Sequence, residues 1–196
     1  MKFEFVAGNL ALDFANTVHD HGSFDPQDDL KTYDDLMSWS RQVGLLGHWK
    51  RRELQRLKPA RAKLEFERTM ELREAVYAIF LSRERGRRVP GEALQRLNWH
   101  LNQVMTRASL QSEGKDFALT WGGSGNPLQF VRGEITRSAV SLLTSDRLNR
   151  VRQCAGESCT WLFFDTSRNG RRRWCDMQAC GNRAKVRRFR RRKTAD

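Results

Sequence analysis

Residues 154–180 read CAGESCTWLFFDTSRNGRRRWCDMQAC, and residues 181–193 continue as GNRAKVRRFRRRK. All four cysteines of the chain lie in this stretch, as two pairs with four residues inside each pair and fifteen between the pairs. Paired cysteines in one short segment indicate a metal site rather than free thiols. Because the second pair leads directly into a basic run, the stretch predicts a small metal-stabilised module that binds a polyanion.

The positive charge of the chain is concentrated in the same region. The sequence has 36 Lys and Arg against 23 Asp and Glu, a net charge of +13. Residues 151–196 hold 13 of the basic and four of the acidic residues, which gives this segment +9 and leaves +4 for residues 1–150. Four thiolates on one Zn²⁺ would lower the charge of the segment, but it would stay strongly positive. This asymmetry favours an electrostatic partner, and we expect nucleic acid.

The rest of the sequence points to a reducing compartment. It has no apolar run of 18 residues, so we expect no membrane span. The opening MKFEFV carries an acid early and is not typical of a secretory signal. We therefore expect a cytoplasmic, nucleoid-associated protein. Thiols stay reduced there, which favours metal binding over disulfides.

Residues 1–148 are predicted to form a mainly α (α+β) domain with short strands. Apolar spacing predicts helices over 10–18, 32–43, 60–85, 92–110 and 128–143, a brief basic helix over 50–57 and a short one opening at 145–147. Strands are expected at 3–5 and 117–121, with a loop over 19–29 and a turn over 122–127. We expect Leu64 and Leu72 on the buried face of the helix over 60–85, and Leu94 and Met105 on the buried face of the helix over 92–110. Trp39, Trp99 and Trp121 are expected in the core.

Residues 149–196 are predicted to form a small four-cysteine module. Cys154, Cys159, Cys175 and Cys180 suit one structural Zn²⁺, since a site with four thiolates has no open position for chemistry. An iron–sulfur cluster is the alternative. The apolar run 161–164, the turn Asn169-Gly170 and residues 171–174 predict a β-hairpin between the pairs, which makes the module treble-clef-like. Trp161, Phe163 and Trp174 are expected to pack around the metal.

A basic helix is predicted to follow the fourth cysteine. Val186 and Phe189 are three residues apart and are expected to anchor it to the hairpin. A helix so rich in arginine becomes stable when phosphates neutralise it. The predicted DNA contacts are Arg168, Arg171, Arg172, Arg173, Arg183, Lys185, Arg187, Arg188, Arg190 and Arg191. The alternative is a solvated or disordered basic tail.

The segment 175–185, CDMQACGNRAK, resembles the bacterial CGNR zinc-finger family, named for its Cys-Gly-Asn-Arg signature. The stretches FDTSRN at 164–169 and RRWC at 172–175 are similar to the same family. Residues 8–17, GNLALDFANT, resemble the opening of the ABATE domain, which usually precedes that finger. The family is described as stress-induced transcriptional regulators. The resemblance implies zinc held by the four cysteines, with Arg183 and Lys185 in the DNA-contacting helix.

The N-terminal domain is expected to sense a small-molecule effector or to dimerise. Asp13, Asn16 and Thr17 are polar positions beside an apolar face, and they could contact a ligand or brace the core. His19 and His21 have no third metal-ligating residue nearby in sequence and are expected to be exposed. No nucleophile–base pattern or phosphate-binding loop is present, so we do not expect an enzyme.

Three function classes remain open at this point. The first is a regulator that binds duplex DNA, which would need a homodimer to read a useful site. The second is an RNA-binding or ribosome-associated module, which exposed aromatic residues beside the arginines would favour. The third is an enzyme in residues 1–150 that the finger targets to nucleic acid.

Overall fold

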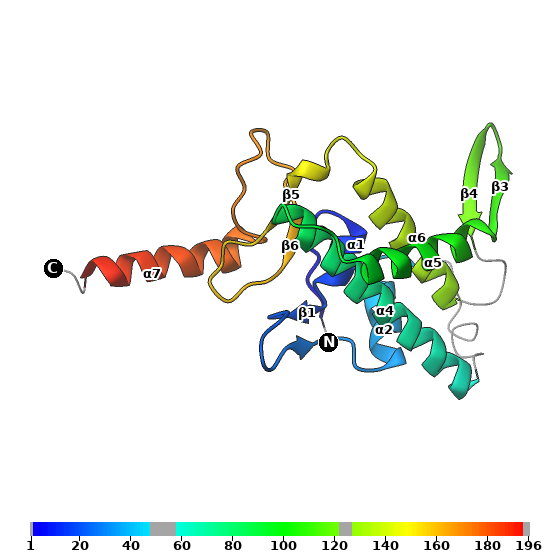
Figure 1. The fold of residues 1–196 in the computed structure, drawn as a ribbon, viewed down its shortest axis with the longest axis horizontal. Coiled ribbons are helices and arrows are strands. Elements are labelled where there is room, and N and C mark those ends of the chain that lie inside the picture. Colours follow the sequence, from blue (N-terminus) through cyan, green and yellow to red (C-terminus); the bar gives the residue numbers. More distant parts are fainter. Residues whose placement is uncertain (1, 48–57, 122–126, 194–196) are drawn as a thin grey trace.

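The computed structural model describes residues 2–47, 58–121 and 127–193. Figure 1 shows a helical body with a long helix projecting from one end and a hairpin from the other. The helices are α1 (Leu10–Ala15), α2 (Tyr33–Gln42), α4 (Pro59–Glu84), α5 (Gly91–Met105), α6 (Pro127–Leu143) and α7 (Asn182–Lys193). The strands are β1 (Val18–His19), β2 (Gln27–Asp28), β3 (Ala108–Glu113), β4 (Asp116–Trp121), β5 (Val151–Gln153) and β6 (Leu162–Phe164). A 3₁₀ turn, η1 (Leu148–Arg150), and a π-turn, η2 (Met177–Gly181), complete the described elements.

The short helix α1 is the centre of the fold. The Asn9 side chain caps it by accepting hydrogen bonds from the backbone N–H groups of Ala11 (3.0 Å) and Leu12 (3.3 Å). Residues 11–15 are all buried, and α1 packs against α4, α6 and β6. A six-residue helix has little stability of its own, so burial on three sides holds it. The contact between α1 and β6 joins the N-terminal part of the chain to the cysteine-rich part.

Most of the predicted helices are confirmed. Thr32 and Asp35 form a capping box at the start of α2, which is the start the sequence predicts. The long helix runs over Pro59–Glu84 and buries Leu72, Val76 and Phe80. The predicted strand 117–121 is confirmed as β4. The predicted helix at 50–57 and most of the predicted turn at 122–127 lie outside the described residues.

Several local predictions are wrong. Residues 3–5 form no strand, and Phe3 N–H donates to the Gln42 side chain instead. The predicted loop 19–29 contains the antiparallel pair β1–β2. The helix expected to reach residue 110 ends at Met105, because 108–113 pair with β4.

The burial of two helices, α4 and α5, also differs in detail from the prediction. In α5 the inward positions are Ala93, Leu97, His100 and Val104, which leaves Leu94 and Met105 exposed. Leu64 near the start of α4 and Trp99 on α5 are exposed as well, whereas Trp39 and Trp121 are buried as predicted. The apolar spacing identified both helices correctly, but in α5 it included Leu94 and Met105 in a buried face to which Ala93 and His100 belong.

The C-terminal hairpin is formed by a different pair of strands from the predicted one. β6 pairs antiparallel with β5, with Val151 opposite Phe164 and Gln153 opposite Leu162. Residues 165–174 form a loop instead, because the buried Asp165 carboxylate accepts the backbone N–H groups of Ser167 (2.8 Å) and Arg172 (3.0 Å). The first cysteine pair therefore lies in the turn of the hairpin itself.

Candidate metal centre and nucleic-acid surface

The four cysteine sulfurs form a compact cluster. All four Sγ atoms lie within 4.8 Å of one another. The Sγ atom of Cys175 is 3.7 Å from that of Cys159 and 3.7 Å from that of Cys180. A tetrahedral Zn²⁺ with bonds of about 2.3 Å requires sulfurs about 3.8 Å apart. The arrangement therefore fits one zinc ion held by four thiolates.

Local backbone geometry brings each pair of sulfurs together. Within the β5–β6 hairpin, Cys154 N–H donates to the Trp161 carbonyl (2.8 Å) and Cys159 N–H to the Gly156 carbonyl (3.1 Å), which closes the first knuckle. A Cβ atom on Gly156 would lie only 3.0 Å from the Cys159 Cβ, so the knuckle needs a glycine there. Asp176 caps η2 by accepting Ala179 N–H (2.7 Å), and this turn carries Cys180 to the start of α7.

The electrostatics of the cluster call for a cation. Hydrogen bonds from the Cys159 and Cys175 thiols lower the pKa of Cys154 to about 2, since they stabilise its thiolate. The same hydrogen bonds raise the pKa of Cys159 to about 12 and raise the pKa of Cys175 as well, because each of these thiols must keep its proton in order to donate it. A divalent ion would reverse this effect and keep all four sulfurs ionised. Zinc bound here would supply a structural crosslink.

Further hydrogen bonds support the thiolates. Cys154 Sγ accepts the backbone N–H groups of Gly156 and Cys175, both at 3.4 Å. The Arg183 guanidinium donates to Cys180 Sγ over 3.2 Å. Since Arg183 lies in the first turn of α7, one of the predicted DNA contacts also joins the basic helix to the metal ligands.

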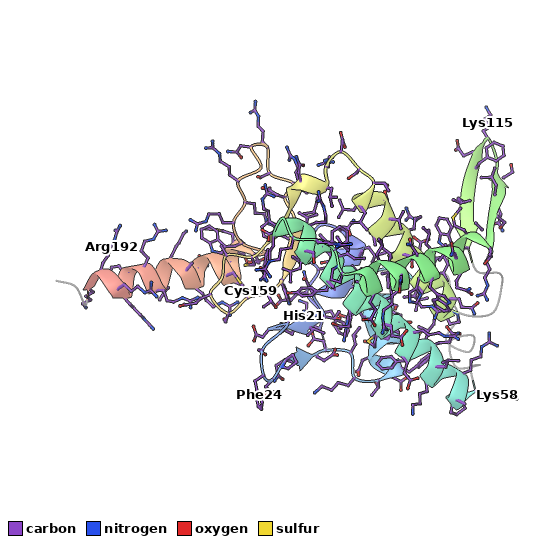
Figure 2. The ribbon with its side chains drawn as sticks, in the orientation of Figure 1. His21, Phe24, Lys58, Lys115, Cys159 and Arg192 are labelled. Atoms are coloured by element: carbon purple, nitrogen blue, oxygen red, sulfur yellow. The ribbon has the colours of Figure 1, made fainter. Side chains whose placement is uncertain are left out.

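The helix α7 forms an exposed cationic surface. It has 12 residues, none of them buried, and eight are Arg or Lys with no Asp or Glu. It projects from the body, and Figure 2 shows Arg192 near its tip and Cys159 beside its inner end. The cysteine cluster therefore lies at the start of the cationic helix α7.

Comparisons with known proteins agree with this arrangement. Residues 8–146 match the model of the ABATE family, described as "Putative stress-induced transcription regulator". The chain belongs to the ABATE family. Residues 150–193 match the CGNR zinc finger, and the resemblance seen in the sequence is thereby confirmed. The comparison with curated proteins found no match. Among the described residues, no helix is long and apolar enough to cross a membrane.

The predicted DNA contacts fall into two groups in the CGNR finger. Arg168, Arg171 and Arg173 are exposed on the loop 165–174, and the α7 residues of the prediction are exposed except Arg187, which is half-buried. Arg172 is different, because its guanidinium donates to the carbonyls of Trp174 (2.9 Å), Val6 (2.9 Å) and Cys175. It also stacks over Phe163 at 4.6 Å. Arg172 therefore holds the finger together and joins it to the N-terminal segment.

Acidic and apolar residues set the surroundings of α7. Arg187 donates to Glu157 in the first knuckle, and Arg191 lies 3.8 Å from the same carboxylate. Val186 and Phe189 were expected to anchor the helix, but they are 50% and 70% exposed. That expectation is wrong, because α7 leaves the finger and does not fold back over the hairpin. Sequence analysis missed Glu157, which lies only two residues before Cys159.

The three ligand candidates in the ABATE unit act as internal braces. Asn16 Nδ2 donates to the Leu162 carbonyl (2.8 Å), and Leu162 N–H donates back to Asn16 Oδ1 (2.9 Å). Asp13 accepts Ala7 N–H (2.9 Å), and burial raises the pKa of its carboxyl to about 6. Thr17 donates to Phe14 and accepts from the buried Arg73. These contacts fit the bracing interpretation, and Asn16 spans the contact between the ABATE unit and the finger.

Other cross-links between the two units were not predicted. His21 was expected to be exposed, but its side chain is only 9% exposed and stacks on Tyr77 with 3.6 Å between ring centroids. His21 N–H donates to Thr160 Oγ1 (2.9 Å), and Tyr77 Oη donates to the Thr160 carbonyl (3.0 Å). The expectation for His21 is therefore wrong, because it packs between α4 and the first knuckle. His19 is half-exposed and bonds to Asp29 (3.0 Å).

Proposed function

We propose that this protein binds duplex DNA through α7 and regulates transcription at the bound site. One observation carries the proposal: a helix with no buried residue and with eight cationic residues begins two residues after a metal ligand. Twelve residues give a helix about 18 Å long, which spans about five base pairs. A helix of this width fits the major groove, where arginines can contact phosphates and guanine.

The zinc crosslink has a defined part in this proposal. None of the residues of α7 is buried, so apolar packing contributes little to its direction. Its base is held by the Cys180 ligand, the Arg183–Cys180 hydrogen bond and the Arg187–Glu157 ion pair. Removing zinc should therefore leave the charge of the helix intact but free its orientation.

A salt titration with matched variants tests the proposal. If α7 neutralises about five phosphates, affinity should fall about 500-fold between 50 and 200 mM salt. The assay is fluorescence anisotropy of a labelled duplex, with zinc-loaded and chelated protein. Arg188→Ala should lower the slope of log affinity against log salt by about one. Arg61→Ala removes the same charge at the far end of the body and should leave the slope unchanged. Equal effects of the two variants would refute a role for α7.

Single-stranded RNA is the second candidate, and the exposed Phe189 favours it. This ring lies between Arg188 and Arg190, where a base could stack on it. Trp161 and Phe163, in contrast, are buried in the finger. Stacking on Phe189 would contribute about 1–3 kcal/mol per base, so Phe189→Ala would weaken RNA binding about 5- to 150-fold. Competition among duplex DNA, single-stranded DNA and RNA decides between the two candidates.

We also propose that the ABATE unit senses an effector. An open groove of about 790 Å³ lies along α4 and α5, with an apolar floor and a partly acidic rim. Its apolar lining includes Phe66, Met70 and Ala78. The lining also holds four carboxylates (Glu67, Glu71, Glu74 and Glu92) against two guanidinium groups (Arg73 and Arg96), and this excess of acid favours an amine with an apolar body. Glu74 in the same lining lies 3.4 Å from His21, which contacts the first knuckle. A rise in Tm with octylamine but not with octanoate would support the site, and equal shifts would refute it.

The proposal includes a homodimer and assigns no catalytic step to the protein. One α7 spans about five base pairs, which is too short for a specific genomic site. Two copies would double the contacted length and place the protein on the nucleoid. Light scattering that shows only monomer at micromolar concentration, with and without duplex DNA, would refute the dimer.

A further inference from the structure

A pocket of about 300 Å³ opens directly onto the cysteine cluster. Its lining includes three of the four ligands, Cys159, Cys175 and Cys180. A structural zinc site is normally closed off by its ligands and the surrounding side chains. This volume has room for several water molecules beside an ion, since each occupies about 30 Å³ in the liquid. Three of the four ligands therefore border a space that small molecules from solvent can enter.

The four ligands differ in accessibility. Cys154, Cys175 and Cys180 are buried, whereas Cys159 is half-buried. Cys154 also lies outside the lining of the pocket, and its sulfur accepts two backbone N–H groups. As a zinc ligand Cys159 would be a thiolate, which is the reactive form of cysteine. Its exposure makes it the ligand that a solvent molecule in the pocket reaches first.

The sulfur of Cys175 is close enough to that of Cys159 for the two to form a disulfide. The Sγ atoms of Cys159 and Cys175 are 3.7 Å apart, and they come from different knuckles. The lining also holds three carboxylates, Glu4, Asp20 and Asp176, against one guanidinium, Arg183. This excess of acid disfavours anionic oxidants, so the pocket suits a small neutral one such as hydrogen peroxide.

We propose that this pocket is an oxidation site, at which hydrogen peroxide converts Cys159 and Cys175 to a disulfide and releases zinc. The Cys159 thiolate attacks one peroxide oxygen, the O–O bond breaks, and hydroxide leaves and takes up a proton to form water. The resulting sulfenic acid is attacked by the Cys175 thiolate. An S–S bond forms, and a second hydroxide leaves as water. The two thiolates lose two electrons, and one peroxide is reduced to two waters with two protons from solvent.

Oxidation at this position would loosen the start of α7. Two of the four thiolates are consumed, so the zinc site is lost. Cys180 and its hydrogen bond from Arg183 then no longer fix the first turn of α7. The consequence for DNA binding rests on the function proposed above, but the chemistry of the pocket does not.

Peptide mapping tests the chemistry without nucleic acid. Cleavage after arginine gives one peptide, 153–168, that contains Cys154 and Cys159, and another, 174–183, that contains Cys175 and Cys180. Zinc-loaded full-length protein is treated with one equivalent of peroxide while a chromogenic chelator records zinc release. The proposal predicts a crosslink between the two peptides through Cys159 and Cys175, formed together with zinc release. Disulfides confined within either peptide, or zinc release without any disulfide, would overturn it.

Pocket-filling variants test the route of entry. Ala179→Leu adds bulk to the pocket, and Ala155→Leu adds the same bulk at an exposed position of the first knuckle outside it. Ala179→Leu should slow zinc release by peroxide several-fold, whereas Ala155→Leu should match the wild type. Equal rates in the two variants would overturn the proposal. Should Ala179→Leu fail to bind zinc, limited N-ethylmaleimide labelling of the wild type must modify Cys159 first, and another order would overturn it.

Binding assays separate this proposal from the DNA-binding one. If unoxidised protein binds duplex DNA and peroxide releases zinc without lowering affinity, the regulatory consequence fails and the DNA-binding function stands. If unoxidised protein does not bind nucleic acid, the proposed function fails, and the disulfide mapping still decides the chemistry of the pocket.

Discussion

Removal of the Asn16 side chain should loosen the finger from the ABATE unit. Asn16 satisfies both backbone groups of Leu162, with its Nδ2 2.8 Å from the Leu162 carbonyl and its Oδ1 2.9 Å from the Leu162 nitrogen. Asn16 and Leu162 are both buried. Asn16→Ala would leave two buried backbone groups without partners, at about 1–3 kcal/mol each. We therefore expect a loss of about 2–5 kcal/mol in the free energy of unfolding.

Thermal unfolding in excess zinc measures this loss. For a chain of this length, about 1 kcal/mol shifts Tm by about 2–4 °C, so the variant should melt about 5–15 °C lower. Asn16→Asp keeps the acceptor for Leu162 N–H but sets a carboxylate against its carbonyl, so it should be similarly damaging. Asn149→Ala removes an exposed amide near the same hairpin and should leave Tm within about 1 °C.

Zinc affinity gives the second readout of the same variant. Leu162 lies three residues after Cys159, so a docked β6 pre-positions the first knuckle for the metal. Competition with a chelator should show weaker zinc binding in Asn16→Ala than in the wild type. An Asn16→Ala variant whose free energy of unfolding lies within about 0.5 kcal/mol of the wild-type value would refute the stability argument. A destabilised variant with unchanged zinc affinity would show that the finger folds independently of the ABATE unit.

Three further predictions concern single side chains. Burial raises the pKa of Asp13 from 3.8 to about 6, so its protonated form stabilises the fold. That contribution, about 3 kcal/mol, is complete below pH 3.8 and lost as pH rises through 6. Urea titrations should show that the free energy of unfolding of the wild type falls by about 2 kcal/mol more between pH 4.5 and pH 7.5 than that of Asp13→Asn. An equal fall in the two proteins would contradict this. Gly156→Ala should weaken zinc binding in chelator competition, since its Cβ would meet Cys159 at 3.0 Å; unchanged affinity would mean that the knuckle adapts. Arg132→Met removes the closer partner of the buried Glu65, at 2.8 Å, and among the described residues leaves only Arg68 at 3.9 Å, so it should lower the free energy of urea unfolding by about 3 kcal/mol. Adding Glu65→Leu in the same chain should restore stability, and no recovery would contradict this.

The sequence predicts those parts of the fold in which local chemistry decides the outcome. The start of α2 follows from Thr32 and Asp35, since a capping box needs only residues three apart. The cysteine cluster follows from its spacing, and α7 follows from the basic run behind Cys180. In each of these cases the deciding contacts lie within a few residues along the chain.

The errors arise where distant residues compete for the same backbone. Residues 161–164 carry a strand signal, and Asn169-Gly170 carries a turn signal, which together favour the wrong hairpin. β6 pairs instead with β5, and Asp165 ties the following loop back on itself. His21 resembles a surface loop residue because nothing near it in sequence shows that Tyr77 and Thr160 will meet it. Long-range packing of this kind has no local signature.

The contacts at the start of α7 determine which part of the protein loses its fixed position when zinc is removed. The finger is joined to the ABATE unit by Asn16, Tyr77 and Arg172, whose hydrogen bonds use no cysteine sulfur. The helix α7 is joined instead to the metal-binding part of the finger, through the Arg187–Glu157 ion pair and Cys180, while its apolar residues Val186 and Phe189 are exposed. Loss of the ion should therefore act mainly on the direction of α7 and less on the packing of the ABATE unit. Circular dichroism after chelation should retain the signal of α4, α5 and α6 while DNA affinity falls. Loss of most helical signal would mean instead that the metal holds the whole chain together.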